Sequence, residues 1–208
     1  MADNAKSPER AAPLPLRERN RLRTRRELLD AALEVFAESG YGSATVENIA
    51  ARAGTSKVTL YTYFPQGREE LFRELYEDVN TELIERASAI YAGGGDFSTR
   101  VLALTEALVE IAGRPLLGRF YSIDDPALDE ALNPVRGHAS RVCAQLIAAD
   151  LAAARKAGAA RTKASPEAIA ELLVGAMRSA LSEVARETVK ATDILAAMEA
   201  LAAGLTIH

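Results

Sequence analysis

The stretch that decides the fold is Thr45–Phe64, TVENIAARAGTSKVTLYTYF. Apolar residues in its first half follow the i, i+3, i+4, i+7 spacing of one buried helical stripe. These residues are Val46, Ile49, Ala50 and Ala53. Gly54 then favours a turn, because glycine adopts a positive φ at little cost. Ser56 predicts the N-cap of a second short helix, whose Leu60 and Phe64 can point inward together.

A short, capped helix held on a small core is the arrangement of a helix-turn-helix protein that reads the DNA major groove. On the outward face, Lys57 can donate to guanine acceptors, while Thr62 and Val58 can contact a thymine methyl group. Other side chains are expected to bind phosphate oxygens or to lie at the same surface. These are Thr45, Thr55, Ser56, Thr59, Tyr61 and Tyr63. Packing is the alternative role for the two tyrosines.

Arginine is concentrated just before this stretch: Arg17–Arg26 contains six Arg and one Glu. Residues 1–68 carry 11 Lys and Arg and 8 Asp and Glu, a net charge of +3, whereas the remainder carries 14 and 21, a net charge of −7. This asymmetry predicts a basic N-terminal module on an acidic body. We expect Arg21 and Arg25 to reach phosphates or the minor groove from an arm, the alternative being a solvated helix start. Arg68 opens the next predicted helix, where a phosphate is favoured.

The composition predicts an all-α protein. Hydrophobic residues make up 49% of the 208 residues and aromatic residues only 5%, and Ala and Leu are strong helix formers. We expect residues 1–17 to form a disordered tail, residues 18–67 a helix-turn-helix DNA-binding domain, and residues 68–208 a helical regulatory and dimerisation domain. The single cysteine, Cys143, excludes an internal disulfide. There is no run of 18 apolar residues and no signal-peptide pattern, so a soluble cytoplasmic protein without a membrane span is expected.

Caps and helix breakers predict the limits of the other helices. The first helix is expected at about residues 20–38 and the long fourth helix at residues 68–92, before three consecutive glycines. Asp96 or Ser98 is predicted to cap the fifth helix. A long helix is expected at residues 134–156. Ser165 followed by Pro166 is a strong start for the next helix, and residues 192–193 are predicted to cap the last one.

The sequence also resembles a known family. The run Leu28–Leu75, LLDAALEVFAESGYGSATVENIAARAGTSKVTLYTYFPQGREELFREL, is similar to the N-terminal DNA-binding domain of TetR-family transcriptional regulators. The frames F-x-x-x-G-Y-x-x-x-T-V-x-x-I-A-x-x-A-G, which ends at Gly54, and S-x-x-x-L-Y-x-Y-F, which ends at Phe64, carry the resemblance. There are two departures. Thr55 stands where the family usually has an apolar residue, and the link Pro65–Arg68 is one residue longer than usual.

The last two helices are amphipathic and rich in Ala and Leu, a pattern that suits either a core or a four-helix bundle between two chains. One short reading helix contacts few bases, so a homodimer on a near-palindromic DNA operator is expected. The resemblance implies the same dimer through the last two helices. It also implies repression that is relieved by an unknown small-molecule effector in the C-terminal domain. The candidate ligand-binding residues are Tyr121, His138, Arg141 and Arg178.

The sequence allows two alternatives to this function. An enzyme is disfavoured, because His138 and His208 lie far apart in the sequence and Cys143 has no obvious base near it. The three glycines at positions 93–95 lack the Lys and Ser or Thr of a phosphate-binding loop. We therefore expect no metal site and no cofactor. The second alternative is a DNA-binding regulator that has no small ligand and is controlled by a protein partner.

Overall fold

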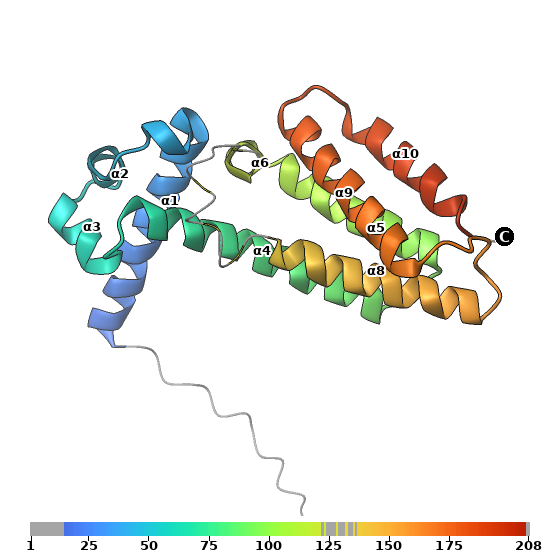
Figure 1. The fold of residues 1–208 in the computed structure, drawn as a ribbon. Coiled ribbons are helices and arrows are strands. Elements are labelled where there is room, and N and C mark those ends of the chain that lie inside the picture. Colours follow the sequence, from blue (N-terminus) through green and yellow to red (C-terminus); the bar gives the residue numbers. More distant parts are fainter. Residues whose placement is uncertain are drawn as a thin grey trace, which may run out of the picture.

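The structure is a computed structural model and describes residues 15–121, 123, 128, 132, 135 and 137–206. Helices are the only regular elements longer than an isolated bridge in these ranges, and Figure 1 shows their arrangement. The helices are α1 (Leu16–Ser43), α2 (Val46–Arg52), α3 (Lys57–Tyr63), α4 (Arg68–Ala92), α5 (Phe97–Ala112), α6 (Pro115–Tyr121), α8 (His138–Lys156), α9 (Pro166–Ala185) and α10 (Ala191–Ala203). The predicted all-α fold is confirmed.

The helix-turn-helix has the local geometry that the sequence predicts. The Thr45 hydroxyl oxygen accepts a hydrogen bond from the backbone N–H of Asn48 and caps α2. Ser56 caps α3 in the same way by accepting from the N–H of Thr59. Between the two helices, Gly54 has a φ of 65°, a value that residues with a Cβ rarely adopt. Because both helices have only seven residues, they depend on these caps and on packing rather than on their own hydrogen bonds.

Two apolar cores hold the molecule together, and α4 belongs to both. Leu71, Phe72 and Leu75 in its first turns pack with residues of α1, α2 and α3. Val79 and Leu83, further along, pack with residues of α5, α8, α9 and α10. A helix of 25 residues is about 37 Å long, so α4 runs from one core to the other (Figure 1). The predicted division between residues 67 and 68 therefore cuts through a core that continues into α4.

The C-terminal domain is a helical bundle around α5. This helix packs against α4, α9 and α10, while α8 packs against α4 and α9. The last two helices thus contact the same bundle, with α9 on α8 and α10 on α5. A single antiparallel bridge between Ala160 and Thr206 joins the segment after α8 to the segment after α10.

Several predicted helix limits need correction. The first helix begins at Leu16, so the predicted disordered tail loses its last two residues; residues 1–14 lie outside the described part of the chain. Gly40, with φ 75° and ψ 173°, breaks α1 where an end was expected, but the chain resumes helical turns to Ser43. The helix α8 begins after Gly137 rather than at residue 134. Lys190 precedes α10, so residues 192–193 lie inside it rather than capping it.

Gly118 allows α6 to pack closely on the end of α5. A Cβ atom at this position would lie 2.1 Å from the carbonyl oxygen of Ala112 and 3.2 Å from the Cβ of Ala185 in α9. A carbonyl oxygen in a packed backbone cannot move aside as the end of a flexible side chain can. The joint between α5, α6 and α9 therefore requires glycine here.

We expect Gly118→Ala to lower the free energy of unfolding by about 2 kcal/mol or more, because overpacking against backbone forces the helices apart. Thermal and urea denaturation would measure the loss. Gly113→Ala is the matched control, since its Cβ would meet only ordinary contacts of 3.4 Å and 3.6 Å. Equal stability of the two variants would contradict the close approach.

Candidate nucleic-acid interface and internal cavity

The outer face of α3 presents apolar and polar groups to solvent. Val58 is 77% exposed and Tyr61 is 42% exposed, while Lys57 and Thr62 are also exposed. Leu60, on the opposite side of the helix, is fully buried. The predicted division of α3 into an inner and an outer face is therefore present, and the outer face can enter a groove wide enough for a helix.

Lys57 is a cation on this face, and it forms an ion pair with Glu47 of α2. Its Nζ lies 2.5 Å from Oε1 of Glu47 and 6.0 Å from the centre of the Tyr61 ring. The hydrogen bond to the carboxylate raises the pKa of Lys57 and lowers the pKa of Glu47. Both side chains are more than half exposed, so this ion pair contributes little stability and can open when a nucleic acid offers Lys57 an acceptor.

The hydroxyl groups expected at phosphates are mostly satisfied within α2 and α3. Thr62 donates to the carbonyl of Val58 at 2.9 Å, and the hydroxyl oxygens of Ser56 and Thr59 lie 2.9 Å apart. Thr45 is exposed and its oxygen accepts the capping bond, so its hydroxyl proton remains available as a donor. Thr55 is only half-buried, so it lies partly at this surface.

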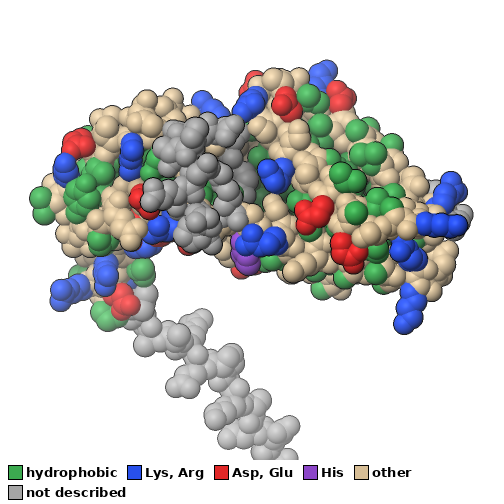
Figure 2. All heavy atoms as spheres, viewed as in Figure 1, with side chains coloured by type: hydrophobic (Ala, Val, Ile, Leu, Met, Phe, Trp, Pro, Cys, Tyr) green, Lys and Arg blue, Asp and Glu red, His purple; other side chains and the backbone are tan. Residues whose placement is uncertain are grey.

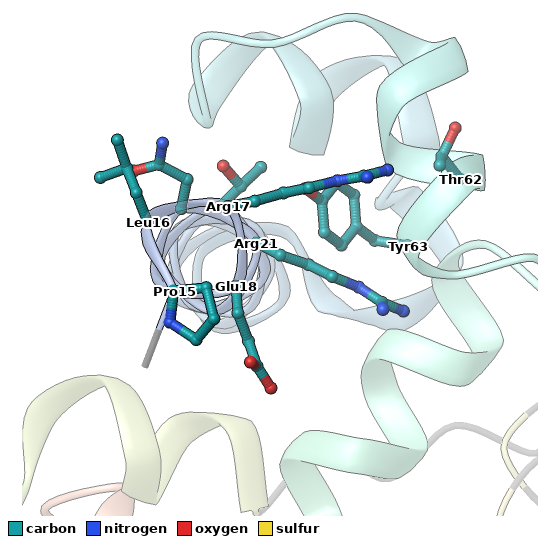
Figure 3. A pocket seen from close by; sticks show the side chains of 9 residues that line it. Pro15, Leu16, Arg17, Glu18, Arg21, Thr62 and Tyr63 are labelled. Carbon is teal, nitrogen blue, oxygen red and sulfur yellow. The ribbon is translucent and has the colours of Figure 1, made fainter. Parts of the chain in front are cut away.

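An open groove of about 1080 Å³ separates the first turns of α1 from the end of α3. Figure 3 shows Arg17 and Arg21 extending from α1 towards Thr62 and Tyr63 of α3. Lys and Arg side chains gather over the start of α1 in Figure 2. The predicted basic arm is thus a helix from Leu16 onward, and it places guanidinium groups beside the reading helix.

Arg21 and Arg25, paired in the sequence prediction, have different surroundings. Arg21 is exposed and lines the groove. Arg25 turns inward: it forms a bidentate ion pair with Glu74 of α4, and its guanidinium lies 4.9 Å from the centre of the Phe64 ring. Arg25 therefore joins α1, the end of α3 and α4, and the structure gives it a positioning role instead of a free phosphate contact.

Arg68 also faces the protein. Its Nη1 donates to the carbonyl oxygens of Ala44, Tyr41 and Gly42, at 3.0, 3.3 and 3.4 Å. The guanidinium also lies 4.6 Å from the centre of the Tyr41 ring. In place of the expected phosphate contact, Arg68 therefore binds the last turn of α1 and the residue that follows it. Gly67 makes this position possible, with a φ of 64° and a Cβ position only 3.1 Å from the Tyr61 ring.

A second hollow lies where the two cores meet. It is a partly open pocket of about 570 Å³ between α4, α5, α6, α8 and α9, within the size range of small-molecule sites. Phe72 and Phe120 on its wall belong to the N-terminal core, whereas Leu83 and Cys143 belong to the C-terminal core. Burial raises the pKa of the Cys143 thiol to about 11. This cavity therefore touches both halves of the molecule.

Only one of the four ligand residues expected from the sequence is among the described residues of the cavity wall. Arg178 lines it, whereas His138 and Arg141 are exposed on α8 and are not part of the described lining. Tyr121 ends α6, but its side chain lies outside the described part of the structure. Sequence reasoning missed residues such as Tyr76, Met177 and Arg186, because the wall is assembled from five separate helices.

Comparison with known proteins is consistent with the geometry of the helix-turn-helix. The family profile of bacterial regulatory proteins of the tetR family matches residues 28–75, the stretch that forms α2, α3 and the helices packed around them. The chain is a TetR-family regulator. It is therefore a transcriptional regulator and not an enzyme. No helix in the described ranges has both the length and the apolar character needed to cross a bilayer.

Similar regulatory proteins come from several bacteria. An uncharacterised helix-turn-helix regulator of Bacillus subtilis, YdgC, is 27% identical over 156 residues, which cover 73% of this chain and 76% of YdgC. The transcriptional repressor LfrR of Mycolicibacterium smegmatis is 31% identical over 129 residues, covering 54% of this chain and 65% of LfrR. Solved structures extend the similarity of fold over most of the chain. NalD of Pseudomonas aeruginosa, the secondary repressor of a multidrug efflux pump, has a TM-score of 0.72 at 22% identity and covers 90% of this chain and 98% of NalD.

Separate substitutions of Arg21 and Arg25 should distinguish a residue that contacts DNA from one that stabilises the fold. Arg21→Ala should weaken binding to any DNA sequence and flatten the slope of log K against log salt by about 0.9, because one phosphate contact is lost. Arg25→Ala should instead lower the free energy of unfolding by about 1 kcal/mol, since a partly buried ion pair is lost. Fluorescence anisotropy at several KCl concentrations and thermal denaturation distinguish the two effects. An unchanged salt slope in Arg21→Ala would exclude its phosphate contact.

Proposed function

We propose that the protein is a cytoplasmic repressor that binds a near-palindromic operator as a homodimer and leaves it when a small molecule fills the cavity. The observation that supports this most directly is the cavity at the junction of the two cores, because an occupant would contact the DNA-binding unit and the regulatory helices together. The relative LfrR is named as a repressor, and so is the structural neighbour NalD.

On DNA, we propose that α3 enters the major groove and that Lys57, Val58 and Thr62 meet base edges. Arg17 and Arg21 would lie over the neighbouring phosphates, with the hydroxyls of the surrounding surface adding further contacts. Those hydroxyl residues are Thr45, Thr55, Ser56, Thr59, Tyr61 and Tyr63. Two copies of α3 about 34 Å apart would reach successive major grooves, which calls for an operator with two inverted half-sites.

The dimer is proposed to form through α9 and α10. Leu172 in α9 is 71% exposed and Leu201 in α10 is 55% exposed, and Val189 between the two helices is 37% exposed. Apolar side chains are scattered over this part of the surface in Figure 2. Burying them against a second copy would remove apolar area from water, the main driving force for permanent dimers.

The cavity can influence DNA binding through aromatic packing. The ring of Phe72 lies 4.5 Å from that of Phe120 on the cavity wall and 5.0 Å from that of Phe36 in α1. An effector that prefers one arrangement of these rings would shift the position of α1 and α4 together. A structural neighbour supports a small-molecule effector: SmeT in complex with triclosan has a TM-score of 0.62 to this chain at 24% identity, covering 84% of this chain and 90% of SmeT.

Binding-site selection followed by titration tests the DNA part of the proposal. The wild-type protein should select an inverted repeat. Lys57→Ala should lose about 1 to 3 kcal/mol of discrimination at one base pair of each half-site. Tyr61→Phe should instead weaken binding to all sequences alike, because a phosphate contact carries no sequence information. Selection of an asymmetric site with one half-site, or unchanged base preference in Lys57→Ala, would contradict this mode.

A metabolite panel tests the cavity, and Cys143 reports its occupancy. The buried thiol is the protein's single cysteine. Because the pKa of Cys143 is raised to about 11 by burial, its thiolate fraction and its alkylation by iodoacetamide should keep rising tenfold per pH unit beyond pH 9. A compound that releases operator DNA should also slow this alkylation at constant pH. Release of the operator by a protein partner, with no active compound in the panel, would favour the alternative of control without a small ligand.

A further inference from the structure

Arg178 of α9 and Arg186, which directly follows this helix, both lie at the cavity, and none of the described residues forms an ion pair with either. Both side chains line the cavity and are exposed. Their separation of eight residues places them about 12 Å apart along the helix axis on neighbouring flanks. Ser179 and Ser182 lie between them on the same wall and add hydroxyl groups. This side of the cavity is therefore polar and cationic.

The lack of a partner sets these two arginines apart from most others in the C-terminal domain. Arg100 pairs with Asp150 at 2.6 Å, and Arg86 and Arg114 share the carboxylates of Glu82 and Glu110. Within the described ranges, by contrast, no carboxylate forms an ion pair with Arg178 or Arg186, and no acidic residue is among the described lining of the cavity. The wall thus carries positive charge that the described residues do not neutralise.

Most of the remaining wall is apolar, apart from the hydroxyl groups of Tyr76 and Ser140. It is contributed by the other helices and by the inner stripe of α9, and includes Leu83, Leu108, Leu132, Met177 and Leu181. A ligand that fills this space removes apolar surface from water. A carboxylate or phosphate on the same ligand can accept charge-assisted hydrogen bonds from a guanidinium, which suits these anions better than an ammonium does. A cationic ligand would be repelled at the same place.

We propose that the effector is an amphipathic anion, with its apolar body between α4, α5 and α9 and its carboxylate or phosphate group at Arg178, within reach of Ser179 or Ser182. Arg186 attracts the anion to the cavity through its positive charge. This assignment rests on the proposed role of the cavity as the effector site. It adds the chemical class of the ligand and the residue that recognises it.

Four probes that share a ten-carbon chain distinguish binding of the head group from binding of the apolar chain. Decanoate and decyl phosphate carry an anion, decanol is neutral, and decyltrimethylammonium is a cation. Isothermal titration calorimetry on the full-length protein should give at least one anionic probe an affinity about tenfold or more above that of decanol, with the cation weakest. The ratio of decanoate to decyl phosphate affinity identifies which head group is preferred. The advantage of the anion over decanol should shrink as KCl is raised.

Variants that each remove one positive charge identify the arginine that binds the anionic head group. Arg178→Gln should lower the affinity for the preferred anion about tenfold or more and leave decanol unchanged, and Arg178→Lys should recover part of the loss. Arg186→Gln should have a smaller effect that depends on KCl. Arg161→Gln is the matched control, because Arg161 is also exposed but lies in the segment between α8 and α9 and does not line the cavity. It should bind every probe like the wild type.

Several outcomes would overturn the assignment. Equal affinity for decanol and the anions, or a loss in Arg178→Gln that is the same for all probes, would show that charge is not recognised. Binding of none of the four probes would exclude this ligand class. If Arg178→Gln became monomeric by light scattering but kept its affinity for the anion, Arg178 would be a dimer contact. The sensor function itself is judged separately: operator release by decanol or by any neutral compound of the panel would preserve it while the anion assignment fails.

Discussion

The packing of Phe72 is the constraint on which the rest of the structure depends. This ring lies in the first turns of α4, edge-on to Phe36 of α1 and tilted against Phe120 of α6. It is 1% exposed, so neither neighbour can shift without disturbing its contacts. The same ring forms part of the cavity wall. The DNA-binding unit and the cavity are therefore joined by one close-packed aromatic cluster, with no flexible linker between them.

Charged side chains reinforce this joint by adding directional contacts to the apolar packing. Arg25 ties α1 to α4 through Glu74, and Arg68 holds the backbone between α1 and α2. At the middle of α4, Glu82 pairs with Arg86 and with Arg114, which lies between α5 and α6. These pairs fix orientation because a guanidinium forms paired bonds only in a narrow geometry. A change at the cavity is thus expected to move α4 as one body.

The arginines of the N-terminal domain show why net charge is a poor guide to contact with DNA. The positive charge of residues 1–68 is real, yet two of the cations, Arg25 and Arg68, face carboxylate or carbonyl groups of the protein. Arg17 and Arg21 at the groove, with Lys57 on α3, remain near the outer surface. The cations that can attract DNA phosphates therefore include those on the side where the start of α1 faces α3 across the groove (Figure 3).

Local rules explain why part of the molecule could be predicted from its sequence. The caps at Thr45 and Ser56, the turn at Gly54 and the burial of Leu60 each depend on residues a few positions apart, and the structure has all four. The resemblance to a family added the identity of the domain. The surroundings of Arg25, Arg68 and the cavity residues could not be read in this way, because their partners lie tens to more than a hundred residues away in the chain. Only the packing of α4 against α1, α5 and α8, together with that of α9 against α5, α6 and α8, brings those groups together. This packing also decides which cations remain free to bind a ligand or DNA.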